Sequence, residues 1–404
     1  MQLQCSNHEC GQGVDRDFAA FQCPKCGDLL ELRANGFRPD PERLRTIWRE
    51  RRLSNIPADR SGVWRFREFL PQFLDESIVT LGEGNTPLLA AARAAEYAGL
   101  PRLQFKHLGW NPTGSFKDLG MTVGVTEARR RGAKTVACAS TGNTSASMAA
   151  YAARAGMTAR VYLPKGKLSR AKVAQSFDYG AEVVEIDGNF DDALAQMIAR
   201  KASDEYFLNS INPFRIEGQK TAIFELMEQL DWNAPEFIVV PGGNLGNSSA
   251  FGKALKELYA AGLISKVPRI VIVQASGANP LVRTVESGLQ SLTMVSNPST
   301  CATAISIGSP RSWRKALQVL RFTKGMVLDV DDEKILEAKA VIGRDGIGCE
   351  PASATTLAGI RRLRLSGEIS CDAHVVAILT GHVLKDPDIV LKMQESRQVR
   401  KGEL

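Results

Sequence analysis

Short apolar runs alternate with helix-periodic segments through the middle of the chain. Each apolar run is followed by a polar or glycine-containing turn and then by a segment with 3.6-residue periodicity. The predicted strands cover residues 134–140, 159–164, 181–186 and 206–208, and the predicted helices cover 143–156, 168–180 and 190–203. This alternation is typical of right-handed β–α–β units, which build a parallel sheet covered by helices.

The pattern resumes later in the chain with a different connectivity. Predicted strands cover 236–241, 268–275 and 374–380, and a further helix begins at Asn247. We therefore expect an α/β fold with two lobes and a cleft between them, and we expect ligands at the carboxyl ends of the strands. The length of 404 residues allows two or three domains, which fits this division.

Composition narrows the class of protein. Hydrophobic residues make up 44% and charged residues 24% of the chain, which excludes disorder throughout. The apolar runs fall far short of the roughly 18 residues that a membrane-spanning helix needs. The first ten residues lack the basic and then apolar pattern of a secretion signal, so we expect a cytoplasmic protein. The net charge of +7 permits an anionic ligand without demanding one.

Four of the eight cysteines crowd into the first 26 residues. They form two pairs, Cys5 with Cys10 and Cys23 with Cys26, and each pair lies near a glycine. In a chain without a secretion signal such pairs indicate metal ligands rather than disulfides. Four thiolates would fill a tetrahedral zinc site and leave no open position, so the predicted role of this zinc-ribbon-like module is structural. Two alternatives stay open: His8 is a ligand in place of a cysteine, or the thiols hold no metal.

An arginine-rich stretch with interleaved aromatic residues covers residues 36–70. One interpretation is a nucleic-acid surface with stacking side chains. The other is a connecting helix and an arm that lies across the main domain, with its arginines solvated or paired with acidic side chains. We favour the arm, because Pro57, Gly62 and Pro71 interrupt the stretch and several acidic residues dilute its charge.

Three turns rich in glycine, serine, threonine or asparagine lie at the ends of predicted elements, where ligands bind in α/β sheets. The turn at 111–120 reads NPTGSFKDLG and places Lys117 at the start of a helix, whose dipole disfavours the charged amine. The turn at 139–147 reads ASTGNTSAS and would either cap a helix or present hydroxyl and N–H groups to an anion. The turn at 241–247 reads PGGNLGN and follows an apolar strand.

The third turn fits a phosphate but matches no common nucleotide motif. Its glycines let the backbone approach a phosphate closely, while the Walker sequence and the G-x-G-x-x-G spacing are both absent. An amine nucleophile, a polar turn and a glycine-rich phosphate loop together are what pyridoxal 5′-phosphate (PLP) requires. Taken alone, Lys117 has the properties of an ordinary surface lysine, so the combination carries the inference.

The sequence resembles the threonine synthases, which belong to the fold type II family of PLP-dependent enzymes related to tryptophan synthase β. The resemblance runs from residue 62 to about residue 395, and many relatives also open with a cysteine ribbon. The stretches that carry it are GVWRFREFLP (62–71), VTLGEGNTPLL (79–89), NPTGSFKDLGM (111–121), ASTGNTSASMAAYAARAG (139–156), LNSINPFRIEGQKT (208–221), PGGNLGN (241–247), TAISIGSPRSW (303–313), EPASATTLAG (350–359) and LTGHVLKDPD (379–388).

The resemblance implies a role for each candidate residue. Lys117 would bind the cofactor covalently and act as the catalytic base, Asn143 would contact the 3′-oxygen of the pyridoxal ring, and Thr380 would donate a hydrogen bond to an unprotonated ring nitrogen. The loop around the cofactor phosphate would consist of Gly242, Gly243, Asn244, Leu245, Gly246 and Asn247. The substrate-binding set would be Ser140, Thr141, Thr144, Asn209 and Arg215, with the arginine as a clamp for a substrate phosphate.

The resemblance also implies the reaction, in which a small-molecule substrate, O-phospho-L-homoserine, and water give L-threonine and phosphate, and it implies a homodimer. The expected domains are the ribbon at 1–35, an arm and the first part of a large PLP-binding domain at 36–106, a small α/β domain at 107–206, and the remainder of the large domain at 207–404. Three other functions stay open: a threonine/serine dehydratase, a cysteate synthase, and a nucleic-acid-binding regulator built on a degenerate enzyme body. A phosphate clamp at Arg215 argues against the dehydratase, and the intact Lys117 argues against the regulator.

Overall fold

A computed structural model describes residues 1–33, 39–165, 170–187, 205–288, 291–391 and 394. The chain divides into two compact units. The first consists of Met1–Asn85, Asn111–Asn233 and Ser249–Lys266, and the second of Thr86–Trp110, Ala234–Ser248 and Val267–Leu404. Each unit has its own sheet and its own hydrophobic core.

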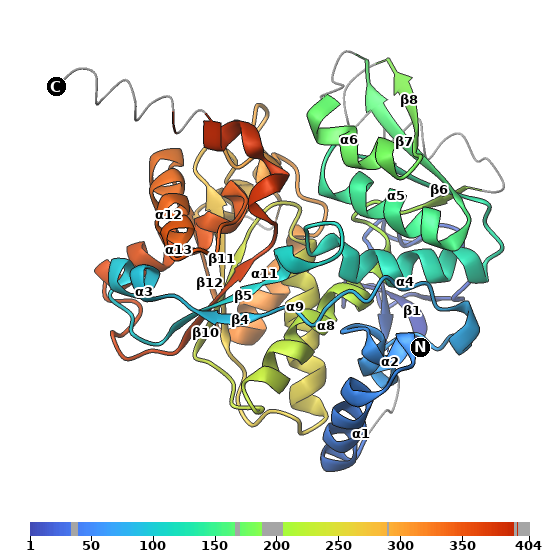
Figure 1. The fold of residues 1–404 in the computed structure, drawn as a ribbon, viewed down its shortest axis with the longest axis horizontal. Coiled ribbons are helices and arrows are strands. Elements are labelled where there is room, and N and C mark those ends of the chain that lie inside the picture. Colours follow the sequence, from blue (N-terminus) through green and yellow to red (C-terminus); the bar gives the residue numbers. More distant parts are fainter. Residues whose placement is uncertain (34–38, 166–169, 188–204, 289–290, 392–393, 395–404) are drawn as a thin grey trace. The chain divides into compact units, whose positions relative to one another are not determined.

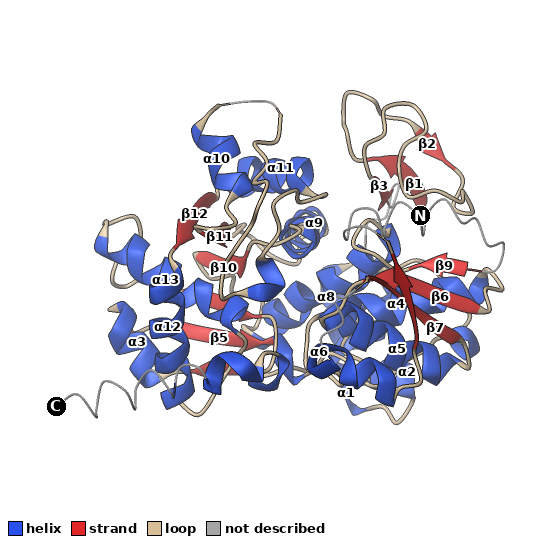
Figure 2. Ribbon diagram, turned by 90° about the horizontal axis from the view of Figure 1, so that it is seen from above, coloured by secondary structure: helices blue, strands red, loops and turns tan. Residues whose placement is uncertain are grey.

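The first unit is built on a four-stranded parallel sheet in the order β8-β7-β6-β9 (Figures 1 and 2). Its strands are β6 (Thr135–Ala139), β7 (Thr158–Pro164), β8 (Glu182–Ile186) and β9 (Glu205–Phe207). The helices of this unit include α4 (Lys117–Arg130), α5 (Asn143–Ala155), α6 (Arg170–Asp178) and α8 (Pro213–Gln229). The strand–helix alternation predicted for 134–208 is therefore present, except that the predicted helix at 190–203 lies outside the described residues.

Helices α4 and α8 approach each other very closely at a glycine. A Cβ atom on Gly218 of α8 would stand 1.8 Å from the carbonyl oxygen of Leu119 on α4, so no larger residue fits there. Asn212 begins α8 by accepting the backbone N–H of Phe214 with its side chain, and Pro213 occupies the first helical position. The start of α4, which carries Lys117, is thus fixed against the helix that carries Arg215.

The N-terminal part of the first unit contains a ribbon and an arm. The ribbon is an antiparallel sheet in the order β2-β1-β3, formed by β1 (Gln2–Cys5), β2 (Gly13–Val14) and β3 (Leu30–Arg33). The arm consists of α1 (Pro41–Leu53), α2 (Pro57–Arg60) and two 3₁₀ helices, η1 (Trp64–Phe69) and η2 (Asp75–Ser77).

Several arginines of the arm are paired with acidic side chains. Arg51 lies 2.6 Å from Glu68, and Arg65, which is only 1% exposed, lies 2.9 Å from Glu228. A further pair joins Arg67 to Asp59 at 2.7 Å. The structure therefore gives the stretch at 36–70 the arrangement expected of an arm with paired arginines.

The second unit is built on a six-stranded sheet in the order β12-β11-β10-β13-β5-β4 (Figure 2). All neighbouring strands are parallel except β4, which is antiparallel to β5. The strands are β4 (Leu88–Ala90), β5 (Leu103–His107), β10 (Phe237–Pro241), β11 (Arg269–Ala275), β12 (Met326–Val330) and β13 (Val375–Leu379). The helical segments are α3 (Ala92–Ala98), η3 (Leu108–Trp110), α10 (Pro280–Glu286), η4 (Thr303–Ile305), α11 (Trp313–Thr323), α12 (Asp332–Arg344), α13 (Pro351–Leu365) and η5 (Val383–Lys385). Helix α9 (Gly246–Ala260) begins in this unit and continues into the first unit.

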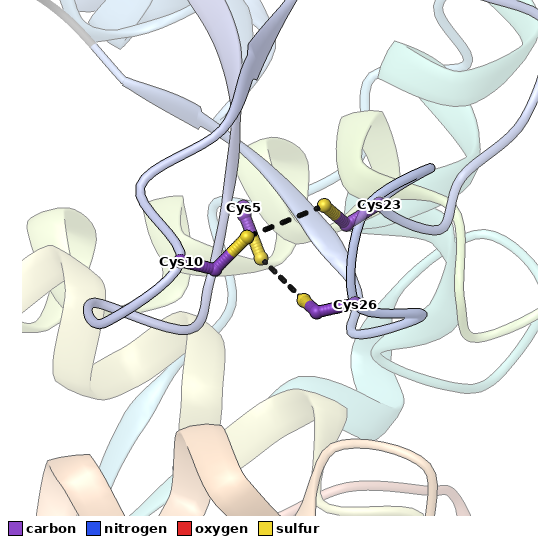
Figure 3. A group of neighbouring side chains, drawn as sticks. All are labelled: Cys5, Cys10, Cys23 and Cys26. Atoms are coloured by element: carbon purple, nitrogen blue, oxygen red, sulfur yellow. Dashed lines mark hydrogen bonds between the residues drawn. The ribbon is translucent and has the colours of Figure 1, made fainter.

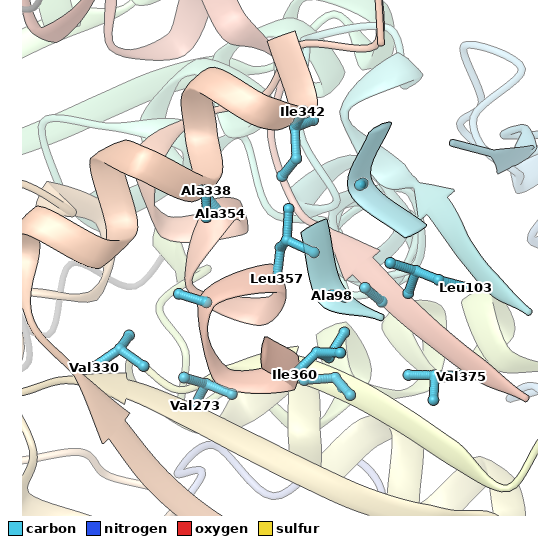
Figure 4. Close-up of a cluster of buried hydrophobic side chains, with 14 of the residues drawn as sticks. Ala98, Leu103, Val273, Val330, Ala338, Ile342, Ala354, Leu357, Ile360 and Val375 are labelled. Atoms are coloured by element: carbon cyan, nitrogen blue, oxygen red, sulfur yellow. The ribbon is translucent and has the colours of Figure 1, made fainter. Parts of the chain in front are cut away.

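The core of the second unit lies between its sheet and the helices α3, α12 and α13 (Figure 4). Leu357 and Ile360 of α13 are fully buried against strand residues such as Val273 and Val375. Because burial of apolar surface contributes about 25 cal/mol per Å², this cluster stabilises the unit. No helix among the described residues has the length and apolar character that a bilayer span requires.

Candidate active site

Lys117 is the first residue of α4 and is half-buried. Its Nζ atom lies 3.9 Å from the centroid of the Phe116 ring. A cationic amine gains from an aromatic face, but the N-terminal end of a helix and partial burial both disfavour its charge. The position therefore suits an amine that reacts in its neutral form.

Asp118 ties the loop before α4 to helix α5. Its carboxylate accepts hydrogen bonds from the N–H and the hydroxyl of Thr113 at 2.7 and 2.6 Å, and from the hydroxyl of Ser147 at 2.5 Å. Burial raises the pKa of Asp118 to about 6, against the opposing effect of these hydrogen bonds. Because Ser147 lies one helical turn beyond Asn143, this carboxyl group connects the segment that carries Lys117 to the start of α5.

The residues Ser140 to Thr144, here called the substrate turn, join β6 to α5. The Oγ atom of Ser140 accepts the N–H of Gly142 at 3.2 Å. The side-chain oxygen of Asn209, which follows β9, accepts the N–H of Ala139 at 3.3 Å. Since β6 and β9 are adjacent and parallel, the structure brings these two predicted substrate-binding segments together at one sheet edge.

Arg215, in the first turn of α8, is only 2% exposed. One guanidinium nitrogen, Nη1, donates to the carbonyl oxygen of Leu208 at 2.9 Å, and Nε has no hydrogen-bond partner in the described part of the chain. Burial lowers the pKa of the guanidinium to about 10, and no acidic side chain contributes to its stabilisation. A buried charge without a counter-ion is unfavourable by several kcal/mol, so this position favours an anionic ligand.

Residues 242–247, here called the phosphate loop, join β10 to α9. The loop is packed tightly from the outside: a Cβ on Gly242 would stand 2.6 Å from Ile272, and one on Gly243 would stand 3.0 Å from Ile305. Leu245 adopts a left-handed backbone conformation with φ +64°, which closes the loop.

Side chains of the phosphate loop fix its backbone at both ends. Asn244 accepts the N–H of Arg311 at 2.6 Å, and Asn247 donates to the carbonyl oxygen of Pro241 at 2.9 Å. The first N–H groups of a 15-residue helix have no partner within the helix and carry its positive dipole. A curved loop that ends in such a helix fits the phosphate of PLP.

Thr380 directly follows β13, the strand next to β10, so it lies at the same sheet edge as the phosphate loop. It is 3% exposed, and its hydroxyl donates to the carboxylate of Glu350 at 2.9 Å. Ser353 accepts the N–H groups of Thr380 and Gly381 at 2.8 and 3.1 Å. The second unit thus holds the predicted phosphate and ring-nitrogen contacts, whereas Lys117 and the substrate-binding set belong to the first.

The four N-terminal cysteines converge in the ribbon (Figure 3). All four Sγ atoms lie within 4.8 Å of one another, and Cys5 and Cys26 are 3.4 Å apart. Although burial opposes ionisation of Cys23, the backbone N–H groups of Cys26 and Lys25 lower the pKa of its thiol to about 7. His8 is not part of the cluster, and its Nδ1 lies 3.3 Å from Arg33. Four sulfur ligands in this arrangement fit a tetrahedral zinc ion.

Comparison with known proteins places these residues in a family. The family model described as "Pyridoxal-phosphate dependent enzyme" matches residues 79–381. A threonine synthase from Methanosarcina acetivorans is 46% identical over 396 residues, which cover 97% of this chain and 94% of the relative. The chain belongs to the threonine synthase family of PLP-dependent enzymes. A threonine synthase from Methanocaldococcus jannaschii is 44% identical and covers 96% of this chain and 94% of its own.

Solved structures agree in fold. The threonine synthase from Escherichia coli, at 20% identity, superposes with a TM-score of 0.72 and covers 96% of this chain and 90% of its own. A maize serine racemase has a TM-score of 0.65 at 21% identity, covering 79% of this chain and 94% of its own. The predicted fold type II α/β architecture, the family and the PLP cofactor are thereby confirmed.

Sequence reasoning gave no role to three residues of the site. Asp118, Glu350 and Ser353 all lie inside stretches that carry the family resemblance. Their hydrogen bonds to Ser147 and Thr380 join positions about 27 to 30 residues apart, which no local pattern displays.

Proposed function

We propose that the chain converts O-phospho-L-homoserine and water into L-threonine and phosphate. The observation that carries this proposal is the buried guanidinium of Arg215, which makes no ion pair with a described carboxylate and lies beside Leu208, next to Asn209. A substrate that brings its own phosphate would supply the missing counter-ion. A dehydratase that acts on serine or threonine has no use for such a site.

Four groups of residues are assigned to the binding of the cofactor. Lys117 holds PLP covalently, Asn143 contacts the 3′-oxygen of its ring, the phosphate loop binds its phosphate, and Thr380 contacts its ring nitrogen. Bound PLP withdraws electrons from the substrate Cα. The tight packing of Gly242 and Gly243 and the hydrogen bonds of Asn244 and Asn247 support the assignment of the loop.

Lys117 also moves the protons of the reaction. Its amine removes the proton from Cα and then one from Cβ, phosphate leaves from Cγ, and Cγ takes up a proton to become the methyl carbon of threonine. Water then adds at Cβ, and the amine returns a proton to Cα. Arg215, Asn209, Ser140 and Thr144 hold the substrate phosphate, and Ser140 and Thr141 hold the carboxylate side. Partial burial and the helix N-terminus keep the amine of Lys117 available as a base.

The function is tested by turnover on phosphohomoserine, phosphoserine and threonine side by side, with phosphate release and the amino-acid product both measured. Phosphate and threonine from phosphohomoserine alone would support the proposal. Turnover of phosphoserine to a sulfonated product in the presence of sulfite would favour a cysteate synthase, and activity on threonine alone would overturn the assignment.

The cysteine cluster is proposed as a structural zinc site with the ligands Cys5, Cys10, Cys23 and Cys26. Metal analysis of the purified chain should give one zinc per chain, and Cys23→Ser should lose it without loss of bound PLP. The family resemblance also supports a homodimer and a cytoplasmic location. Light scattering on the purified protein would measure the oligomeric state.

A further inference from the structure

The cysteine ribbon is attached to the end of α4 through a buried carboxylate. The side chain of Glu127, in the last turn of α4, is fully buried. Its carboxylate accepts a hydrogen bond at 2.8 Å from Nη2 of Arg16, which lies in the ribbon between the two cysteine pairs. Arg130 and Arg131, at the end of the same helix, donate to it at 2.8 to 2.9 Å. One of the three guanidinium groups around this carboxylate therefore comes from the ribbon.

The same part of the ribbon also contacts the beginning of α8. The Cζ atom of Arg16 lies 5.7 Å from the centroid of the Phe214 ring, within the range of a cation–π interaction. Phe214 is fully buried and directly precedes Arg215. Arg131 donates to the backbone carbonyl oxygens of residues 16–18, which holds this segment of the ribbon against both helices.

Helix α4 in turn limits the space around Arg215. A Cβ on Gly120 would stand 2.8 Å from the carbonyl oxygen of Arg215, and one on Gly124 would stand 3.2 Å from its Cγ atom. Positions 120, 124 and 127 follow the i, i+4, i+7 spacing and share one face of α4. The face that Glu127 attaches to the ribbon is thus the face that packs against the arginine, so a shift of α4 displaces Arg215.

A second contact fixes α8 from the side of the ribbon. Lys253 of α9 donates to the carbonyl oxygen of Leu32 in β3 and to the carboxylate of Glu217 in α8. Glu217 is fully buried and accepts a further hydrogen bond from Lys220 at 2.6 Å. Because Glu217 lies two residues after Arg215, contacts with the ribbon hold the first turn of α8 on both sides of the arginine.

We propose that the ribbon positions the phosphate clamp, with Arg16 holding α4 through Glu127 so that Arg215 keeps the place in which it binds the substrate phosphate. The inference rests on the proposed function, in which Arg215 binds that phosphate. The guanidinium is already directed by its hydrogen bond to Leu208, so a small displacement of α4 turns its other N–H groups away from the anion. Arg16 is a positioning residue, because it acts on the phosphate only through α4 and Arg215.

The alternative is a role of Arg16 in the fold alone. Loss of Arg16 would then lower the melting temperature without changing how tightly Arg215 binds an anion. The binding of phosphate, rather than stability, separates the two roles.

The test is calorimetric titration of the PLP-loaded chain with inorganic phosphate. Bound PLP fills the phosphate loop, so the added phosphate reports on the clamp. We expect Arg16→Gln to weaken phosphate binding by about 3–30-fold. It should raise KM for O-phospho-L-homoserine by a similar factor with little change in kcat. Arg49→Gln, an exposed change in α1, is the matched control and should leave all three values unchanged.

Two further variants keep the outcomes distinct. Glu127→Gln breaks the same link from the side of α4, so it should weaken phosphate binding even if Arg16→Gln does not fold. Arg215→Met should bind no phosphate, and adding Arg16→Gln to it should lower kcat/KM no further, because both residues serve one interaction.

Each contrary result has a different meaning. If Arg215→Met binds phosphate as tightly as the wild type, the clamp itself is wrong, and the proposed function loses its support together with this inference. If the clamp holds but Arg16→Gln or Glu127→Gln binds phosphate as tightly as the wild type, this inference alone is overturned. Losses of kcat/KM that add in the double variant would also overturn it, because Arg16 would then act independently of Arg215.

Discussion

The substrate turn after β6 and the phosphate loop after β10 occupy equivalent places in their sheets but are held very differently. In the phosphate loop, Asn244 and Asn247 fix the backbone, and the two leading glycines press against Ile272 and Ile305. In the substrate turn, a Cβ on Gly142 would meet nothing within 4 Å. No side-chain hydrogen bond caps the start of α5 there.

This difference matches the ligand that we propose for each turn. A cofactor that stays through many turnovers benefits from a site whose shape is complete before binding. A substrate that enters and leaves in each cycle needs polar groups that the protein has not already used. The hydroxyls of Thr141 and Thr144 have no hydrogen-bond partner among the described residues, whereas both asparagine side chains named above are engaged by the protein itself.

The strongest test of the comparison removes the covalent link to PLP that we propose for Lys117 of the first unit. Lys117→Ala should lower kcat by about 10⁴-fold or more, because the variant lacks both the amine that holds the cofactor and the base. The preformed phosphate loop should still bind PLP without a covalent bond. Absorbance and equilibrium dialysis would check this, and a variant that takes up no PLP at all would contradict the idea that the loop is complete on its own.

A smaller loss of activity is expected when Arg215, the buried arginine of the first unit, is replaced. Arg215→Met should lower kcat/KM for the phosphorylated substrate by about 10²–10³-fold, since the partner of a buried anion is lost. The melting temperature without ligand should stay the same or rise, because the change removes a buried charge that has no carboxylate partner. Inorganic phosphate should raise the melting temperature of the wild type but not that of the variant. A strongly destabilised variant would instead indicate that Arg215 serves the fold.

A matched pair of glycine changes compares the two turns directly. Gly242→Ala places a methyl group 2.6 Å from Ile272 and should weaken PLP binding by about 10–100-fold, as expected for overpacking of about 1–3 kcal/mol. Gly142→Ala meets no atom within 4 Å and has a φ of −116°, so PLP binding should be unchanged. Cofactor titrations followed by absorbance measure both. Equal losses in the two variants would remove the distinction between a packed and an open turn.

Some strands could be predicted from the sequence and others could not. Strand β10 consists of buried apolar residues and was predicted, as were β6 and β13. Strand β5 was missed because it ends in Lys106 and His107, which are polar yet fully buried. Lys106 donates to the carbonyl oxygen of Thr86 at 2.6 Å, and His107 lies 2.8 Å from that of Gly348. Tertiary partners of this kind make a polar strand end stable, and the sequence does not display them.

The site residues, too, could be predicted only where the signal is local in the sequence. The glycines of the phosphate loop and the lysine before a helix are local signals, so the positions of Lys117 and Gly242 could be proposed from the sequence. The direction of the Thr380 hydroxyl could not, because its acceptor Glu350 lies 30 residues away in the chain. The expectation that Thr380 donates to the ring nitrogen followed from the family resemblance and stays a prediction.

The last prediction concerns a buried carboxyl group of the first unit, Asp118. Asp118 links the segment before Lys117 to Ser147 of α5, and burial raises its pKa from 3.8 to about 6. Between these two values the unfolded chain releases the proton while the folded chain keeps it, so this group makes the protein less stable as pH rises from 4 to 6. The loss in free energy of unfolding is about 3 kcal/mol at most and stays constant at higher pH.

Asp118→Asn lacks the titrating group, so the difference in melting temperature between wild type and variant should change between pH 4 and 6 and stay level above pH 6. A difference that is constant from pH 4 to 8 would mean that Asp118 is ionised throughout, and that hydrogen bonds rather than burial set its charge.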